Sequence, residues 1–310
     1  MSTPENNPLL SVEGLTVSYG GKDPVVQDVS FAVEAGKITA IVGESGSGKT
    51  TSAMASIGLL DPSAHIHSGT IRFKGEDITG ATNAQWRQLR GVHIGLVPQD
   101  PNNSLNPLKT IGASVEDGMA IHGIGDAASR KERTLALLER VGIDDPERRY
   151  AQYPHELSGG MKQRVLIAAA VALEPQVIIA DEPTSALDVT VQKTILDLLD
   201  EMRAELGLGI VLITHDLAVA GDRADDVVIM QRGRVVERGP AGEVLANPTQ
   251  EYSRRLLDNA PSLAVADAYH RPSPSTETLL SVEGLSKQFG DFTAIENISF
   301  EVKRGSTHAL

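Results

Sequence analysis

The sequence of 310 residues contains no cysteine, and this absence excludes several kinds of site. Disulfide bonds, zinc–thiolate centres and iron–sulfur clusters all require cysteine sulfur, so this chain's side chains can form none of them. Positive charge is also scarce, with 28 lysines and arginines against 41 aspartates and glutamates and a net charge of −13. This balance argues against broad binding to the phosphate backbone of nucleic acids.

Long apolar runs are missing as well. The longest, Val165 to Leu173, is bounded by Arg164 and Glu174, and it is far shorter than the roughly 20 residues that a membrane-spanning helix needs. The first ten residues, MSTPENNPLL, contain no basic segment followed by an apolar core, so they do not resemble a signal peptide. We therefore expect a cytoplasmic protein that reaches a membrane only through partner proteins.

The chain does contain the material for a globular core, since 41% of its residues are hydrophobic and 22% are charged. Short apolar runs that read as buried strands alternate with segments of helical periodicity. Strands are expected at Ile38–Val42, Thr70–Phe73, His93–Val97, Val177–Ala180, Ile210–Thr214 and Val227–Gln231, and helices from Thr50 to about Leu60 and at Ile111–Ile121, Ser129–Val141, Gly160–Leu173 and Asp188–Leu206. This order predicts an α/β fold with a parallel sheet and a helical insertion at about residues 100–170.

The stretch LLSVEGL occurs twice, at residues 9–15 and 279–285, and an aromatic–glycine pair follows each copy at the same spacing. A repeat of this kind indicates a duplicated structural unit. In register, the chain ends two positions before the residue that would match Gly43. We interpret residues 279–310 as the start of a second, truncated domain, and the whole chain as the first half of a tandem protein that is cut at Leu310.

A glycine-rich stretch fits the phosphate-binding pattern G-x-x-x-x-G-K-[ST] in full. It follows an apolar strand and precedes a helical segment, which is the context that the pattern requires. The backbone N–H groups of such a loop converge on phosphate oxygens, its lysine adds positive charge and its hydroxyl can bind Mg²⁺. The residues are Gly43, Glu44, Ser45, Gly46, Ser47, Gly48, Lys49 and Thr50.

Two acidic residues, Asp181 and Glu182, end the apolar strand that begins at Val177. A solvated acidic strand end would be the simpler interpretation if this pair stood alone. Because ligands of open α/β sheets bind at the carboxyl ends of the strands, the pair is expected to face the phosphate loop. Asp181 would then hold the metal and Glu182 would act as the general base on the attacking water.

Two further polar residues follow apolar strands. His215 comes after Ile213-Thr214, and Gln99 comes after Val97-Pro98. An isolated histidine is more often structural, but at this edge of the sheet His215 could contact the γ-phosphate or position the water. The amide of Gln99 could contact Mg²⁺ and the water, and so sense the nucleotide.

A second helix start, in Leu157-Ser158-Gly159-Gly160-Met161-Lys162-Gln163, identifies a family. Ser158 is a good N-cap, and the two glycines leave the helix N–H groups open to an anion. Together with the motifs above, this segment resembles the signature of ABC-type ATPases. The resemblance covers about residues 8–257 and implies a P-loop NTPase fold, with a RecA-like core, an N-terminal antiparallel β subdomain and an inserted α-helical subdomain.

The resemblance also implies a mechanism in which two such domains enclose two ATP molecules head to tail. Tyr19 would stack on adenine, and Thr51 would complete the phosphate loop. Ser158, Gly159 and Gly160 of one domain would reach the nucleotide that is bound to the other. In the run Ser185-Ala186-Leu187-Asp188, the aspartate Asp188 would lie at the contact between the domains. The implied ligands are ATP and Mg²⁺, with Thr50, Gln99 and Asp181 at the metal.

A narrower similarity points to the importers of oligopeptides, dipeptides and nickel. It rests on the segments 99–107 (QDPNNSLNP) and 153–157 (YPHEL). In that branch the helical insertion contacts two membrane permease subunits, an extracytoplasmic binding protein supplies the solute, and the ATPase lies on the cytoplasmic face of the cell membrane. The branch has a His-Pro-Tyr-type motif near its C-terminus, where this chain has Asn247-Pro248-Thr249-Gln250-Glu251-Tyr252.

These considerations divide the chain into three parts. Residues 8–246 are expected to form the ATP-binding domain, residues 247–278 a C-terminal extension and linker, and residues 279–310 the start of the second domain. One alternative is a soluble tandem ABC ATPase of translation or DNA repair, against which the acidic charge and the absent cysteines argue. Another is an ATP-binding module without turnover, which the presence of Glu182 and His215 disfavours.

Overall fold

The computed structural model describes residues 8–21, 23–185, 187–258, 277–290, 292–306 and 308. They belong to two units, Met1–Leu263 and Ala264–Leu310. Within these ranges no helix has both the length and the apolar character that crossing a membrane would require. Most of the predicted linker, like Ala186, lies outside the described residues.

A six-stranded sheet forms the centre of the first unit, in the order β10-β9-β3-β8-β7-β6. All neighbouring strands pair in parallel except β10, which is antiparallel to β9. The strands are β3 (Ile38–Val42), β6 (Ile94–Val97), β7 (Val177–Asp181), β8 (Gly209–Thr214), β9 (Asp226–Gln231) and β10 (Arg234–Pro240). Every residue of β3, β7 and β8 is buried, as expected for strands that are covered on both faces.

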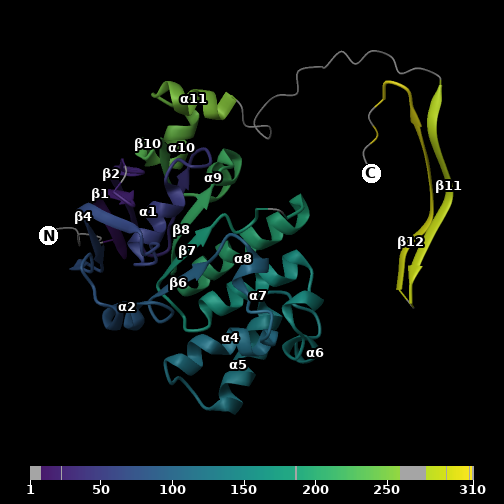
Figure 1. Ribbon diagram of the computed structural model, residues 1–310, viewed down its shortest axis with the longest axis horizontal. Coiled ribbons are helices and arrows are strands. Elements are labelled where there is room, and N and C mark those ends of the chain that lie inside the picture. The colour runs from purple at the N-terminus through teal and green to yellow at the C-terminus, as the bar shows by residue number, and fades with distance from the viewer. Residues whose placement is uncertain are drawn as a thin grey trace. The chain divides into compact units, whose positions relative to one another are not determined.

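Helices follow these strands and cover the sheet (Figure 1). They are α1 (Lys49–Ser56), α8 (Val189–Leu206), α9 (Leu217–Arg223), α10 (Ala241–Ala246) and α11 (Glu251–Asp258). The carboxyl ends of β3, β7 and β8 lie at one edge of the sheet, because the three strands are parallel and adjacent through β8. The sheet therefore brings the phosphate loop, the acidic pair and His215 to a common edge.

A second, antiparallel sheet is built from the N-terminal part of the chain, in the order β2-β1-β4-β5. Its strands are β1 (Leu10–Tyr19), β2 (Val26–Val33), β4 (Ala64–Phe73) and β5 (Glu76–Asp77), and α2 (Asn83–Leu89) follows them. Leu10, Leu15 and Ile71 are fully buried and pack in one cluster with Ile41 and Ile179 of the central sheet. The two sheets thus share a core.

Between β6 and β7 the chain forms only helices. They are α3 (Pro101–Ser104), α4 (Ile111–Ile121), α5 (Ala127–Arg140), α6 (Pro146–Tyr150), the short 3₁₀ helix Pro154–Glu156 and α7 (Gly159–Val171). Val115, Met119, Leu138 and Ile167 are buried between them. The predicted α/β fold with an antiparallel β subdomain and inserted helices is confirmed, and α4 has both of its predicted bounds.

Two predicted bounds were wrong by more than two residues, and several others differ by one or two. The helix after the phosphate loop ends at Ser56 rather than near Leu60. Gly58 has φ +64°, and a Cβ on it would lie 2.3 Å from Cε2 of Trp86, so the chain turns there to pass the indole ring. The strand predicted at Thr70–Phe73 begins six residues earlier, at Ala64, because β1 offers pairing partners along that whole length.

The second unit is a hairpin of β11 (Thr278–Phe289) and β12 (Phe292–Lys303). Its pairing repeats that of β1 and β2. Leu280, Val282 and Leu285 lie opposite Val302, Phe300 and Ile298, just as Leu10, Val12 and Leu15 lie opposite Val33, Phe31 and Val29. The N–H of Gly284 donates to Ser299 Oγ at 2.9 Å, and the N–H of Gly14 donates to Ser30 Oγ at the same distance. The sequence repeat is therefore also a structural repeat. That the hairpin begins a second ABC domain stays a prediction.

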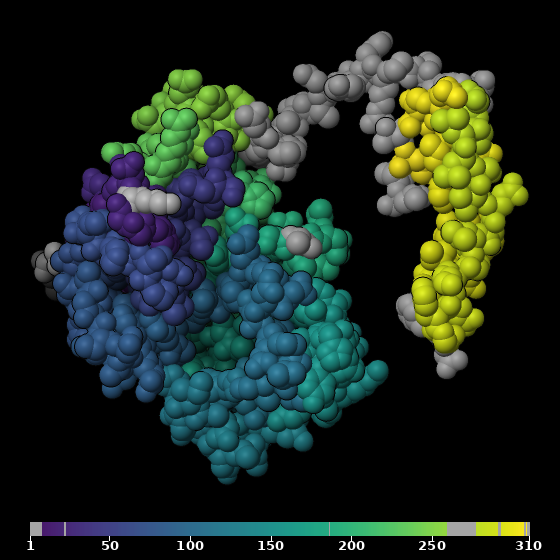
Figure 2. Space-filling view, viewed as in Figure 1, coloured from purple at the N-terminus to yellow at the C-terminus, as the bar shows by residue number. Residues whose placement is uncertain are grey.

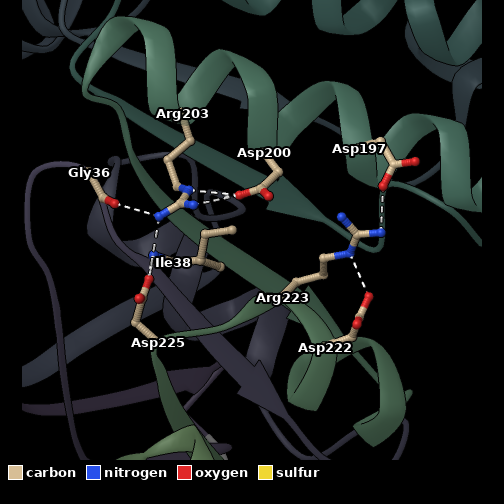
Figure 3. Close-up of polar contacts among 8 residues, drawn as sticks. All are labelled: Gly36, Ile38, Asp197, Asp200, Arg203, Asp222, Arg223 and Asp225. Atoms are coloured by element: carbon tan, nitrogen blue, oxygen red, sulfur yellow. Dashed lines mark hydrogen bonds and ion pairs between the residues drawn. The ribbon is translucent and has the colours of Figure 1, made fainter.

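Arg203, on α8, binds the helix to the strands beneath it (Figure 3). Its Nη1 donates to the Gly36 carbonyl at 2.7 Å and its Nε to Asp200 Oδ1 at 2.9 Å. Asp225 Oδ2 lies 3.8 Å from Nη1 and accepts the N–H of Ile38 at 2.8 Å. The guanidinium therefore links α8 to both ends of the turn that precedes β3.

A second arginine joins α8 to α9 in the same view (Figure 3). Arg223 Nη2 donates to Asp197 Oδ1 at 2.6 Å, and its Nε lies 2.8 Å from Asp222 Oδ2. The side chain of Arg223 is only 13% exposed. Since α8 begins directly after Asp188 and α9 begins two residues after His215, this ion pair connects the two helices that follow those residues.

We predict that Arg203→Met lowers the free energy of unfolding by about 1–2 kcal/mol, because the Gly36 carbonyl and the Asp225 carboxylate lose a charged donor. Urea denaturation followed by circular dichroism measures this change. Lys193→Met, on the same helix, is the control. Its ion pair with Asp197 is largely exposed, so the change should stay within about 0.5 kcal/mol. Equal effects of the two substitutions would contradict the assignment.

Candidate functional site

The phosphate loop connects β3 to α1, and close contacts require glycine at two of its positions, Gly43 and Gly48. A Cβ on Gly43, which has φ +155°, would lie 2.2 Å from the carbonyl oxygen of Met230 on β9. Gly48 has φ +97°, and a Cβ there would lie 3.1 Å from the Val25 carbonyl. The loop therefore packs against β9 on one side and the start of β2 on the other. This packing holds its backbone in the conformation that exposes N–H groups at the start of α1.

Lys49 is folded over this loop. Its Nζ donates to the Gly43 carbonyl at 2.8 Å and to the Glu44 carbonyl at 3.0 Å, and the residue is 5% exposed. Burial lowers the pKa of the Lys49 ammonium, while the nearby carboxylates of Glu182 and Asp181 act in the opposite direction. The positive charge is thus held in a partly dehydrated position where an anionic ligand would interact with it strongly.

Asp181 ends β7 directly beside the start of α1. The Thr50 hydroxyl donates to Asp181 Oδ1 at 3.1 Å, and the residue is 4% exposed. Burial raises the pKa of the Asp181 carboxyl, which the hydrogen bond from Thr50 partly offsets. Hydroxyl, carboxylate and amide oxygens are ligands that suit Mg²⁺, which also keeps waters and phosphate oxygens in its shell. Thr50, Asp181 and Gln99 therefore fit a magnesium ion that is shared with a bound nucleotide.

The described protein side chains alone do not complete a metal site here. The described part of the chain contains no cluster of three or more histidine, aspartate or glutamate side chains that could hold a metal ion. A cation at Thr50 and Asp181 would therefore depend on ligand phosphates for part of its coordination. That is the usual arrangement for Mg²⁺ in nucleotide-hydrolysing proteins.

Glu182 is held by the residues that follow the two neighbouring strands. Its Oε2 accepts from Gln99 Nε2 at 3.0 Å and lies 3.3 Å from His215 Nδ1. Its backbone has φ +43°, in the left-handed region that side chains rarely adopt, and its N–H donates to the Ile213 carbonyl at 2.9 Å. Strained backbone of this kind gathers at functional sites. Here it turns the Glu182 carboxylate toward Gln99 and His215.

Two adjoining pockets meet at Glu182. The first, of about 310 Å³, is lined by Tyr19, Val25, the loop residues Ser45–Thr51, Gln99 and Glu182. The second, of about 250 Å³, is lined by residues that include Glu182, Thr184, Gln192 and His215. The structure therefore brings most of the predicted site residues together, from the aromatic Tyr19 to the expected base. Gly43 and Glu44 do not line the first pocket, but their carbonyl oxygens accept hydrogen bonds from Lys49, which does.

The residues that are predicted to act on the nucleotide of a second domain lie outside these pockets. The Ser158 hydroxyl accepts the N–H of Met161 at 3.3 Å and caps α7, and Asp188 caps α8 by accepting the N–H of Val191 at 3.0 Å. A Cβ on Gly160 would lie 2.7 Å from Cγ1 of Val191. Among the described residues, Ser158, Gly159, Gly160 and Asp188 line neither pocket. Their predicted roles in a second domain's site therefore stay predictions.

One contact to the phosphate loop was missed at the sequence level. The hydroxyl oxygen of Tyr252, on α11, accepts the N–H of Glu44 at 3.3 Å. The sequence shows a tyrosine in the C-terminal extension, but 208 residues separate it from the loop. No spacing rule indicates a contact over that distance.

Comparison with known proteins agrees with this geometry. Residues 26–185 match the family model of ABC transporters. The dipeptide transport ATP-binding protein DppD of Haemophilus influenzae is 42% identical over 259 residues, which make up 83% of this chain and 78% of DppD. The ABC transporter ATP-binding protein YejF of Escherichia coli is 41% identical over 97% of this chain, which spans only 59% of YejF.

A solved structure is also similar. The dimeric ATP-binding cassette MJ0796, in a post-hydrolysis state with ADP and Pi bound, has a TM-score of 0.66 and 28% identity, covering 75% of this chain and 98% of the cassette. The fold, the phosphate loop and the family model thus agree. The chain belongs to the ABC transporter family of ATP-binding proteins.

Proposed function

We propose that this chain binds and hydrolyses ATP and energises an importer of dipeptides or oligopeptides. The observation that carries the proposal is the pocket in which the Lys49 loop faces Glu182, with Gln99 and His215 on the same carboxylate oxygen. The similarity to DppD supports the solute class. The similarity to a cassette with ADP and Pi bound supports hydrolysis.

Each residue would contribute to this reaction through its position. The loop N–H groups and Lys49 would bind the phosphates, and Tyr19 would stack on adenine at the edge of the pocket. Glu182 would accept a proton from the attacking water, while Gln99 and His215 hold its carboxylate in place. Thr50, Asp181 and Gln99 would hold Mg²⁺, which would supply positive charge beside the phosphates when bound.

A second ATP-binding domain would complete the site. Ser158, Gly159, Gly160 and Asp188 are exposed or half-buried near two helix starts and away from the Lys49 pocket, as expected for residues that serve another domain. The repeated hairpin and the match along nearly all of this chain to YejF, a longer protein, support a tandem arrangement. We therefore propose that the partner domain belongs either to the same polypeptide or to another subunit.

The helical insertion would contact the permease. Leu108 and Ile121, which lie in this insertion, are 85% and 71% exposed, so apolar surface is available for a partner protein. The ATPase would then lie on the cytoplasmic face of the membrane as a peripheral protein that is bound to two permease subunits. An extracytoplasmic binding protein would act on it only indirectly.

A purification experiment tests this proposal against a soluble ABC ATPase of translation or DNA repair. The tagged chain should co-purify with two membrane permease subunits, and deletion of its gene should abolish uptake of a radiolabelled dipeptide. Recovery with ribosomes or DNA, together with unchanged peptide uptake, would favour the alternative.

We predict that Lys49→Ala raises the dissociation constant for ATP at least about tenfold, because a charged donor to the phosphates is lost. Isothermal titration calorimetry measures this constant. Lys37→Ala is the matched control, since the Lys37 side chain is 42% exposed, pairs with Glu34 and does not line the pocket. Unchanged affinity of the Lys49 variant would refute the assignment of the phosphate site.

For Glu182→Gln we expect retained ATP binding and a fall in the hydrolysis rate of about 10²-fold or more, because the amide keeps the shape but loses the base. With turnover blocked, ATP should accumulate in a closed state of two domains. Phosphate release and size-exclusion chromatography with ATP measure the two effects. Glu174→Gln, at an exposed ion pair with Arg133, should hydrolyse ATP at the wild-type rate. Near wild-type turnover of the Glu182 variant would show that another group is the base.

A further inference from the structure

The C-terminal segment that begins at Asn247 is anchored to the ATP-binding unit before α11 starts. Glu237, on β10, accepts from the N–H and the hydroxyl of Thr249, both at 2.8 Å, and from the N–H of Gln250 at 3.3 Å. Three hydrogen bonds to one carboxylate fix the chain direction at this point. They place α11 beside β10 (Figure 1).

The first turn of α11 then inserts an aromatic ring into a core. Tyr252 is 7% exposed and belongs to a cluster with Val42, Leu217 and Ala220. Val42 is the residue directly before the phosphate loop, and Leu217 begins the helix that follows His215. The ring therefore packs between the end of β3, which leads into the phosphate loop, and the start of α9, which follows His215.

The hydroxyl of the same residue contacts the loop. Tyr252 Oη accepts the N–H of Glu44 at 3.3 Å, and the carbonyl of Glu44 accepts from Lys49 Nζ at 3.0 Å. The backbone of Glu44 is thus held at its N–H by the C-terminal helix and at its carbonyl by the phosphate-binding lysine. A shift of this backbone would move the ammonium that it helps to position.

Within the loop, the Glu44 carbonyl also accepts the N–H of Ser47 at 3.2 Å, and further contacts hold the positions on either side of Glu44. The N–H of Gly233, in the β9–β10 turn, donates to the Ser47 carbonyl at 3.0 Å, and Gly43 packs against Met230. Figure 2 shows the green atoms of the segment near residue 250 against the purple and dark blue atoms of the first 50 residues. The loop therefore has supports from β9, from its following turn and from α11.

We propose that Tyr252 is a positioning residue for ATP binding, and that residues 247–258 form part of the ATP site rather than a separate extension. The inference rests on the proposed binding of ATP at the Lys49 loop. Its physical basis is preorganisation, since a loop that is already held in place loses less freedom when it closes around phosphates. Tyr252 touches no reacting atom and acts only through the Glu44 backbone and Lys49.

The test is Tyr252→Phe in the full 310-residue chain, which keeps the ring and removes the hydroxyl. We expect the dissociation constant and the KM for ATP to rise between about twofold and tenfold, as for the loss of one hydrogen bond, with little change in kcat. The N–H of Glu44 should exchange faster with solvent deuterium in nucleotide-free protein, as measured by NMR. The melting temperature should hardly change.

Tyr150→Phe is the matched control, since the Tyr150 hydroxyl donates to Glu116 Oε1 at 2.5 Å in the helical insertion, outside the pocket. It should leave ATP affinity and Glu44 exchange unchanged. Unaltered affinity in Tyr252→Phe, with or without a lower melting temperature, would overturn the inference while leaving the proposed function intact. Failure of the wild-type chain to bind ATP would overturn both.

Discussion

The order of strands in the central sheet determines which side chains lie beside the carboxylate of Glu182. In that sheet β7 lies between β8 and β6, and all three strands run in parallel. Their ends therefore present His215, Glu182 and Gln99 in that spatial order, although Gln99 precedes Glu182 by 83 residues. Since β3 lies on the other side of β8, the phosphate loop joins the same edge. The chemistry of the site is thus a consequence of sheet topology.

The buried charges of Lys49 and Asp181 favour the binding of charged ligands. Lys49 and Asp181 are both almost fully buried. Burial lowers the pKa of the Lys49 ammonium and raises the pKa of the Asp181 carboxyl, so it favours the neutral form of each. Dehydrating a charge costs free energy unless an opposite charge or a metal compensates it. Phosphates beside Lys49 and a divalent cation beside Asp181 would supply that compensation at the same time.

The sequence predicted those parts of this structure that are encoded locally. The strands β3, β7 and β8 are continuous apolar runs, and the loop from Gly43 to Thr50 is recognisable because glycine, lysine and a hydroxyl must occur at fixed spacing. The end of α1 was predicted wrongly, because it depends on a distant indole ring that packs on Gly58. The contact of Tyr252 with Glu44 was missed for the same reason, since a tertiary hydrogen bond leaves no periodic trace in the chain.

The residues that are expected to act on a second domain also have internal structural roles. Val191 donates its N–H to Asp188 and packs against the backbone of Gly160. The starts of α7 and α8 are therefore in direct contact, and a residue larger than glycine at position 160 would push them apart. Through Arg223, α8 is further tied to α9 and so to the segment that carries His215. These contacts connect the surface that a second domain would touch to the segment whose His215 lies 3.3 Å from Glu182, the proposed general base.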